Sequence, residues 1–156
     1  NYCKPEKFFN FIEVNSESFD EVIYHQVGKT IIDDETAFKN LKQNLKVLSN
    51  MLGPKLHYWG PWVEGRTDYI NIITNKTSQI PQSLVTNFAK LDLKLEEFSI
   101  SANINYYSLY KLFLPYQSNL VEGNCLLYRD HNHLSRCAEL FFANKFKKEL
   151  SDAILE

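Results

Sequence analysis

The sequence is short of cysteine, has no excess of basic residues and contains no long apolar run. Its 17 Lys and Arg against 19 Asp and Glu give a net charge of −2, so it lacks the basic face that nucleic-acid binding requires. No apolar stretch approaches the roughly 20 residues of a membrane-spanning helix, and the first residues contain no signal-peptide core. Repeats and low-complexity tracts are absent from the sequence as well. The composition that remains, 44% hydrophobic and 14% aromatic, is that of a folded globular domain.

The three cysteines match no zinc-binding spacing, and their odd number leaves at least one thiol without a disulfide partner. Cys137 falls on the apolar side of a helical pattern, where we expect a small core residue. Cys3 and Cys125 could form a disulfide if the protein lies outside the cytoplasm, and the sequence leaves that pairing open.

The pattern of apolar residues predicts an α/β domain. The 156 residues suffice for one core. Runs rich in β-branched and aromatic residues predict strands at residues 21–25, 55–59, 100–107 and 124–128. Apolar residues at spacings of three and four predict helices at residues 5–14, 35–52, 81–95, 108–113 and 134–150. A strand, a long helix and a strand in succession form a βαβ unit, so we expect a three-layer sandwich with a mostly parallel sheet.

The most informative stretch is residues 128–135 (YRDHNHLS), between the last predicted strand and the last predicted helix. This places Asp130 and His133 on a turn at the sheet edge where α/β proteins bind ligands. A carboxylate and an imidazole three residues apart can form the orienting half of a hydrolase relay, although the nucleophile is then missing.

Simpler interpretations of the same residues remain open. Asp130 could cap the last helix beside a surface histidine, although we expect Ser135 to provide that cap. Asp130, His131 and His133 could bind a metal ion only with a fourth ligand from elsewhere, so we expect no metal site. Trp62 could stack on a sugar ring or could be partly buried in the core.

Residues 128–135, followed by Cys137-Ala138, resemble the Asp-x-x-His-Leu-Ser-x-x-Gly-Ala block of SGNH hydrolase-like domains. The resemblance is to the extracytoplasmic SGNH domain fused to membrane acyltransferase-3 proteins, which O-acetylate bacterial surface polysaccharides. Residues 19–24 look like the Asp-x-Val-Ile strand of that family, and residues 58–62 like its Gly-Pro-x-Pro strand end. Residues 106–110 resemble the segment before its final block. The resemblance spans most of the chain, but only the final block is specific.

The sequence departs from the family pattern at three places. The Gly-Asp-Ser block that carries the family's nucleophile is absent, so we expect residues 1–156 to be a single SGNH-like domain truncated before its first strand. Cys137 stands where the family has glycine. A cysteine pair that flanks the loop before the final block is reduced to Cys125, with residues 114–116 near the place of its partner.

The resemblance implies a role for particular residues. His133 would be the base and Asp130 the acid of a Ser-His-Asp relay whose serine this chain does not contain. Substrate-binding candidates at the same edge of the sheet are His131, Trp62, Gly60 and His25. Gly60 is also a candidate for the glycine of an oxyanion hole, with Asn71 as a candidate for its asparagine.

The resemblance further implies an O-acyltransferase that transfers acetyl groups to cell-surface polysaccharide without a cofactor. Its partners would be a carbohydrate acceptor and an acyl donor supplied by a membrane acyltransferase domain. The domain would lie at the periplasmic or extracellular face, tethered to the membrane in its parent protein. The alternatives are a degenerate module that binds glycan or protein, and a serine esterase. A homodimer through an exposed sheet edge is a further expectation.

Overall fold

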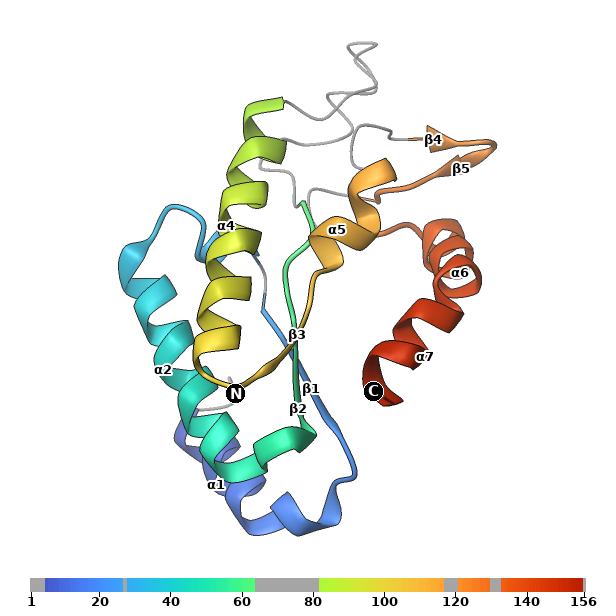
Figure 1. Ribbon diagram of the computed structural model, residues 1–156. Coiled ribbons are helices and arrows are strands. Elements are labelled where there is room, and N and C mark those ends of the chain that lie inside the picture. Colours follow the sequence, from blue (N-terminus) through green and yellow to red (C-terminus); the bar gives the residue numbers. More distant parts are fainter. Residues whose placement is uncertain (1–4, 27, 64–81, 117–120, 130–132, 156) are drawn as a thin grey trace.

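The computed structural model describes residues 5–26, 28–63, 82–116, 121–129 and 133–155, and its centre is a three-stranded parallel sheet (Figure 1). The strands follow in chain order across the sheet: β1 (Val22–His25), β2 (Leu56–Trp59) and β3 (Asn105–Tyr107). Both neighbouring pairs are parallel, as the predicted βαβ unit requires.

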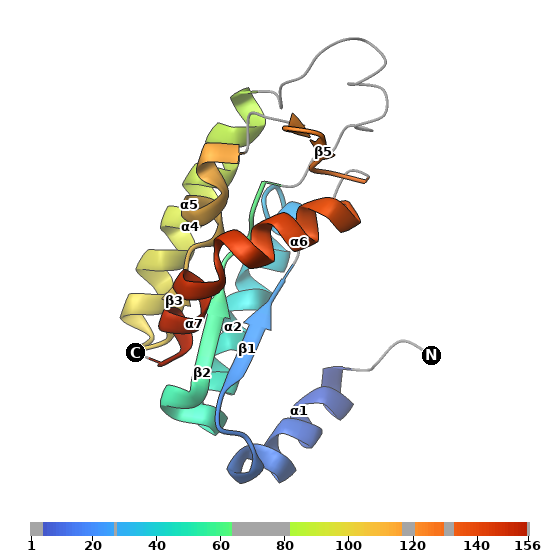
Figure 2. The ribbon, with the colours of Figure 1, turned by 90° about the vertical axis from the view of Figure 1, so that its right-hand side faces the viewer.

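Helices cover both faces of the sheet. Helix α2 (Glu35–Leu52) connects β1 to β2, and α4 (Gln82–Ser101) precedes β3. Because the strands advance in one direction, right-handed crossovers place both helices on one face. Figure 2 shows α6 (Arg136–Lys145) and α7 (Lys147–Leu155) on the opposite face. The prediction of a three-layer α/β fold with a parallel sheet is confirmed.

The remaining short elements lie at the ends of this sandwich. Helix α1 (Pro5–Asn15) packs beside α2 near the start of β1, and α5 (Leu109–Phe113) follows β3. Single 3₁₀ turns are found at η1 (Ser16–Ser18), η2 (Gly28–Thr30), η3 (Gly53–Lys55) and η4 (Leu114–Tyr116). Within the described part of the chain, no helix has the length and apolarity to cross a membrane.

Helix α2 shows why some boundaries are readable from sequence. Asp34 caps its first turn by accepting a 2.9 Å hydrogen bond from the N–H of Ala37. Its end is set by Gly53, whose positive φ of 57° suits a residue without a side chain, and by the proline that follows. One stripe of the helix is buried in the core: Leu41, Leu45, Leu48 and Leu52.

The prediction of a strand over residues 100–107 is wrong in its first half. Helix α4 continues to Ser101, because its buried stripe extends through Leu95 to Ser99. Ile100 therefore lies on the outer face and is 75% exposed. The chain then turns at Asn103, whose φ is 53°, and only Asn105–Tyr107 pairs with β2.

The last predicted strand, residues 124–128, does not join the parallel sheet. Within it, residues Cys125–Leu126 form β5, which pairs with β4 (Val121–Glu122) in an antiparallel hairpin. Gly123 turns the hairpin with a φ of 57°. The final predicted helix is divided into α6 and α7 at Phe146, where the backbone leaves helical geometry.

Candidate functional site

The carboxyl ends of the parallel strands form the edge where an open α/β sheet binds ligands. Strand β1 ends there at His25, whose Nδ1 lies 3.0 Å from the carbonyl oxygen of Trp59 at the end of β2. Because a carbonyl oxygen only accepts hydrogen bonds, Nδ1 carries the proton, and Nε2 of the neutral ring has a lone pair. The His25 side chain is exposed, so Nε2 can accept a proton or a hydrogen bond from a ligand.

His25 and Trp62, two of the predicted site residues, lie next to each other. Their ring centroids are 5.8 Å apart. Trp62 also packs edge-to-face against Phe113 on α5, with the ring centroids 5.4 Å apart. Trp62 is half-buried, so it joins the exposed histidine to the packed interior. The structure agrees with partial burial of this tryptophan, and its stacking on a sugar ring stays a prediction.

Five aromatic side chains, which we call the aromatic cluster, hold α6 against α5: Phe113, Tyr116, Phe141, Phe142 and Phe146. The shortest separation between ring centroids is 4.6 Å, between Phe113 and Phe142, in the edge-to-face arrangement that aromatic pairs prefer. Because Phe113 also contacts Trp62, the cluster connects the sheet edge to the helix that follows His133.

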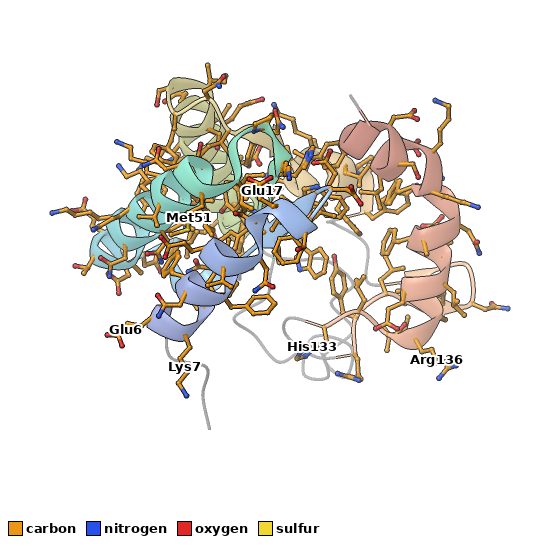
Figure 3. All side chains as sticks on the ribbon, turned by 90° about the horizontal axis from the view of Figure 1, so that it is seen from below. Glu6, Lys7, Glu17, Met51, His133 and Arg136 are labelled. Atoms are coloured by element: carbon orange, nitrogen blue, oxygen red, sulfur yellow. A yellow bond between two sulfur atoms is a disulfide. The ribbon has the colours of Figure 1, made fainter. Side chains whose placement is uncertain are left out.

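The backbone around His133 is fixed on both sides. An antiparallel bridge joins Tyr128 to Leu134, and the N–H of Arg129 donates to the carbonyl oxygen of His133 at 2.9 Å. Ser135 caps α6 by accepting a 3.1 Å hydrogen bond from the N–H of Ala138, as predicted. The His133 side chain is exposed, and Figure 3 shows it on the segment that leads into α6, where Arg136 is also labelled.

A disulfide between Cys125 and Cys137 encloses the same segment, with its two Cα atoms 5.9 Å apart. The expectation that Cys137 is a core residue is therefore wrong: it lies exposed in the first turn of α6, where strand β5 passes close to the helix. The open possibility of a bond from Cys125 to Cys3, which lies outside the described residues, is replaced by this pair. The disulfide staples the hairpin to α6 across the segment that contains His133.

Asp130, His131 and Asn71 lie outside the described residues, so the pairing of Asp130 with His133 stays a prediction. The described residues include no group of three side chains placed to hold a metal ion.

Gly60 has a clear packing reason to be glycine. A Cβ atom there would lie 2.1 Å from the hydroxyl oxygen of Tyr106, too close for any side chain. Its N–H already donates to the carbonyl oxygen of Tyr107 at 2.8 Å, so this amide proton is engaged within the sheet. A role of Gly60 in substrate binding stays a prediction. Because its N–H is engaged, such a role would depend on the space left by the absence of a side chain.

Sequence reasoning missed a buried polar network beneath this edge. Asp92 on α4 is 1% exposed, and its carboxylate accepts hydrogen bonds from the hydroxyls of Tyr106 and Ser108. Burial raises the pKa of Asp92 and that of Tyr106 above their ordinary values. Ser108 also caps α5, so the network ties α4 to the end of β3 and to α5. A lone aspartate between two leucines of a helix gives no sequence signal of this role.

No protein-family model and no curated protein matches the chain. Among solved structures, it is similar to the periplasmic domain of a lipopolysaccharide acetyltransferase from Salmonella ser. Paratyphi A, with a TM-score of 0.62 and 16% sequence identity. The two share a fold. The match covers 94% of this chain and 61% of that one, so the chain spans less than two thirds of the matched domain. At this identity the similarity establishes the architecture, which agrees with the fold implied by the family resemblance.

Proposed function

We propose that the chain is part of an extracytoplasmic, SGNH-like acyltransferase domain that transfers acetyl groups to a cell-surface polysaccharide. The observation that carries the proposal is the fold shared with an acetyltransferase periplasmic domain over 94% of the chain. A disulfide between Cys125 and Cys137 supports a location outside the cytoplasm, because such bonds persist in oxidising compartments. In the parent protein, the domain would be tethered to the membrane at its periplasmic or extracellular face.

In this proposal, His133 is the general base, and Asp130 holds its imidazole in the productive tautomer. A serine oxygen attacks the acetyl carbonyl carbon while His133 takes the serine proton. His133 then gives the proton to the donor's leaving group, and an acetyl-serine remains. A sugar hydroxyl attacks this ester, its proton passes to His133, and the serine oxygen leaves with that proton. The acetyl group is thereby transferred, and no cofactor is consumed.

The serine would come from a segment outside these 156 residues. The outer edge of β1 is a suitable place for such a segment, since among the described strands β1 pairs only with β2. Ile23 on this strand is 45% exposed, although most apolar strand residues are covered in a completed sheet. A strand added here would end at the same carboxyl edge as His25. The same open edge would otherwise allow two copies of the chain to pair, which is our proposal for a homodimer.

His25 and Trp62 would contact the carbohydrate acceptor. The proton on Nδ1 of His25 is committed to the Trp59 carbonyl, so Nε2 can accept a hydrogen bond from a sugar hydroxyl. The indole of Trp62 offers an aromatic face beside it. His131 is a further candidate for contact with the acceptor. The acyl donor would be supplied by a membrane acyltransferase domain of the parent protein.

The test compares variants of the full-length parent protein by the acetyl content of its polysaccharide, measured by mass spectrometry. His133→Ala and Asp130→Asn are each expected to lower acetylation by about a thousandfold or more. Arg136→Ala is the matched control, because Arg136 is exposed one turn away on the same segment and should leave acetylation unchanged. Thermal unfolding of each variant checks that the fold is retained.

Three results would contradict the proposal. Undiminished acetylation in His133→Ala would remove the relay. Release of free acetate without acetylated sugar would indicate a serine esterase. Glycan or protein binding with neither reaction would indicate a non-catalytic module.

A further inference from the structure

A groove of about 730 Å³ runs between α2 and α4, on the face of the sheet opposite α6 and α7. Its floor is apolar: Ile31 and Leu91 are 2% and 5% exposed, and Phe38 is half-buried beside them. Helix α2 contributes Lys39 and Lys42 to one wall. The opposite wall, on α4, contains Lys90 and Lys94.

The ammonium groups of these four lysines lack a close acidic partner in the described part of the chain. None of the four side chains forms an ion pair or a hydrogen bond with another described residue. The ammonium group of Lys42 instead lies over the ring of Phe38, 4.8 Å from its centroid. Because the whole chain has a net charge of −2, this is a local concentration of positive charge rather than a consequence of composition.

Acidic residues occupy one end of the same groove. Asp33, Asp34 and Glu35 line it where the chain enters α2. The Oδ1 atom of Asp34 is committed to the cap of α2. The groove therefore has an apolar floor, two basic walls and one acidic end, so it can distinguish the direction of a bound chain as well as its charge.

We propose that this groove binds an acidic amphipathic helix of a partner protein. Lys39 and Lys42 are three residues apart and Lys90 and Lys94 are four apart, so each wall repeats at about one helical turn of 5.4 Å. Carboxylates on a partner helix repeat at the same interval along each side of its apolar stripe. The apolar side chains of that stripe would rest on the floor beside Phe38, as in other helix-in-groove complexes. A basic residue at one end of the partner would face the acidic end.

Other anionic partners fit this groove less well. A flat anionic membrane would meet Asp33, Asp34 and Glu35 together with the lysines, and it could not reach the floor. An anionic oligosaccharide would leave the apolar floor without a matching surface. Because the groove lies on the face opposite α6 and α7, its occupation would leave the proposed acetyl-transfer site open, and the inference does not depend on that function.

The test uses the full chain and a designed helical peptide of about five turns, with leucines along one stripe and glutamates on both flanks. We expect the peptide to shift amide NMR signals of α2 and α4 and to bind measurably by calorimetry. The charge reversal Lys39→Glu with Lys94→Glu should weaken this binding at least tenfold. The matched control, Lys7→Glu with Lys147→Glu, changes the net charge equally at exposed sites on α1 and α7 and should leave the affinity unchanged.

Several outcomes would overturn the proposal. One is the absence of peptide binding to a folded wild-type chain. A second is equal loss of binding in the two charge-reversed proteins, which would indicate attraction by net charge alone. A third is equal binding of a matched peptide with lysines in place of its glutamates. Binding of a polyglucuronate oligosaccharide or of phosphatidylglycerol vesicles through Lys39 and Lys94, without peptide binding, would assign the groove to a different partner.

Discussion

The hydroxyl of Tyr106 donates a 2.5 Å hydrogen bond to Oδ1 of Asp92 in the interior of the protein. Ser108 donates to both oxygens of the same carboxylate, at 2.8 and 2.9 Å. Burial raises the pKa of Asp92 above its ordinary value of 3.8, although these two donors and the charge of Lys111 oppose the shift. The network therefore has two opposing effects on stability. Its hydrogen bonds fix α4 to β3 and α5, while burial removes an ionisable carboxyl group from water.

Replacing Asp92 should change the pH dependence of stability. The pKa of Asp92 is higher in the folded state, so its contribution to stability is greatest below the unfolded pKa and is lost as pH rises through the folded pKa. An asparagine side chain does not titrate, so D92N should gain stability relative to the wild type as the pH rises above the unfolded pKa of this carboxyl group. Urea unfolding of both proteins from acid to neutral pH measures the difference. A constant difference would contradict the shifted pKa.

Loss of the acceptor should cost more than loss of the charge. Asp92→Ala leaves the hydroxyls of Tyr106 and Ser108 without their buried acceptor, and we expect the free energy of unfolding to fall by about 3 kcal/mol. D92N, which keeps an acceptor oxygen, is the control and should be less destabilised at neutral pH. Equal effects of the two substitutions would show that these hydrogen bonds do not hold the network together.

Gly60 should not tolerate a methyl group. The Cβ atom of Gly60→Ala would lie 2.1 Å from the Tyr106 hydroxyl oxygen and 2.8 Å from its ring carbon Cζ, so we expect a loss of about 1–3 kcal/mol. Tyr106→Phe removes the nearer atom, and Gly60→Ala should therefore cost less in that background. A double-mutant cycle by urea unfolding measures this coupling. Gly123→Ala is a control with no atom within 4 Å of the new methyl group, and it tests backbone strain alone.

The parts of the fold that depend on local chemistry were predictable from sequence. The cap at Asp34, the leucine stripe of α2 and the stop at Gly53 are all set by neighbours within one or two helical turns. Two strands joined by one long helix can be arranged in few ways, because the crossover between parallel strands is almost always right-handed. The parallel pairing of β1 and β2 follows from these facts alone.

The errors concern pairings that the pattern of residue types does not specify. Residues 124–128 read as a sheet strand, but Cys125 pairs instead with Glu122 across a tight turn. The disulfide to Cys137 depends on that hairpin lying beside α6, which the spacing of the cysteines does not reveal. The contact of His25 with Trp62 was partly predictable, since His25 ends one predicted strand and Trp62 follows the next, and the two strands were expected to be parallel. Whether the two side chains meet depends on the register of β1 and β2.

The disulfide should stabilise the segment around His133. Closing a loop between Cys125 and Cys137, which have a sequence separation of 12, contributes about 3 kcal/mol in the chain-entropy model. Cys125→Ser with Cys137→Ser should therefore lower the melting temperature and abolish its sensitivity to reductant. Hydrogen exchange at Arg129 and Ser135 should become faster, because their amide bonds lie within the stapled segment. Cys3→Ser is the control and should melt like the wild type with and without reductant.

An interaction at the opposite edge of the sheet should fix the start of β1. Nε2 of His57, a residue 5% exposed on β2, lies 2.7 Å from Oε2 of Glu21, whose side chain is 40% exposed. Removing the carboxylate by Glu21→Ala leaves a buried ring nitrogen without its partner, which should cost about 1–3 kcal/mol. His57→Ala removes the whole ring and leaves a cavity in the core. Because the carboxylate of Glu21 can still be hydrated, we expect most of the lost stability in this variant to come from the cavity.

A double-mutant cycle separates these two effects for Glu21 and His57. The coupling energy from urea unfolding should be about 1 kcal/mol, since one partner is buried and the other is partly screened by solvent. The Lys148–Asp152 pair on α7 provides a reference: its lysine is 86% exposed, and its coupling should be about 0.3 kcal/mol. Strictly additive losses at Glu21 and His57 would mean that β1 is positioned by its backbone pairing with β2 and not by this side-chain contact.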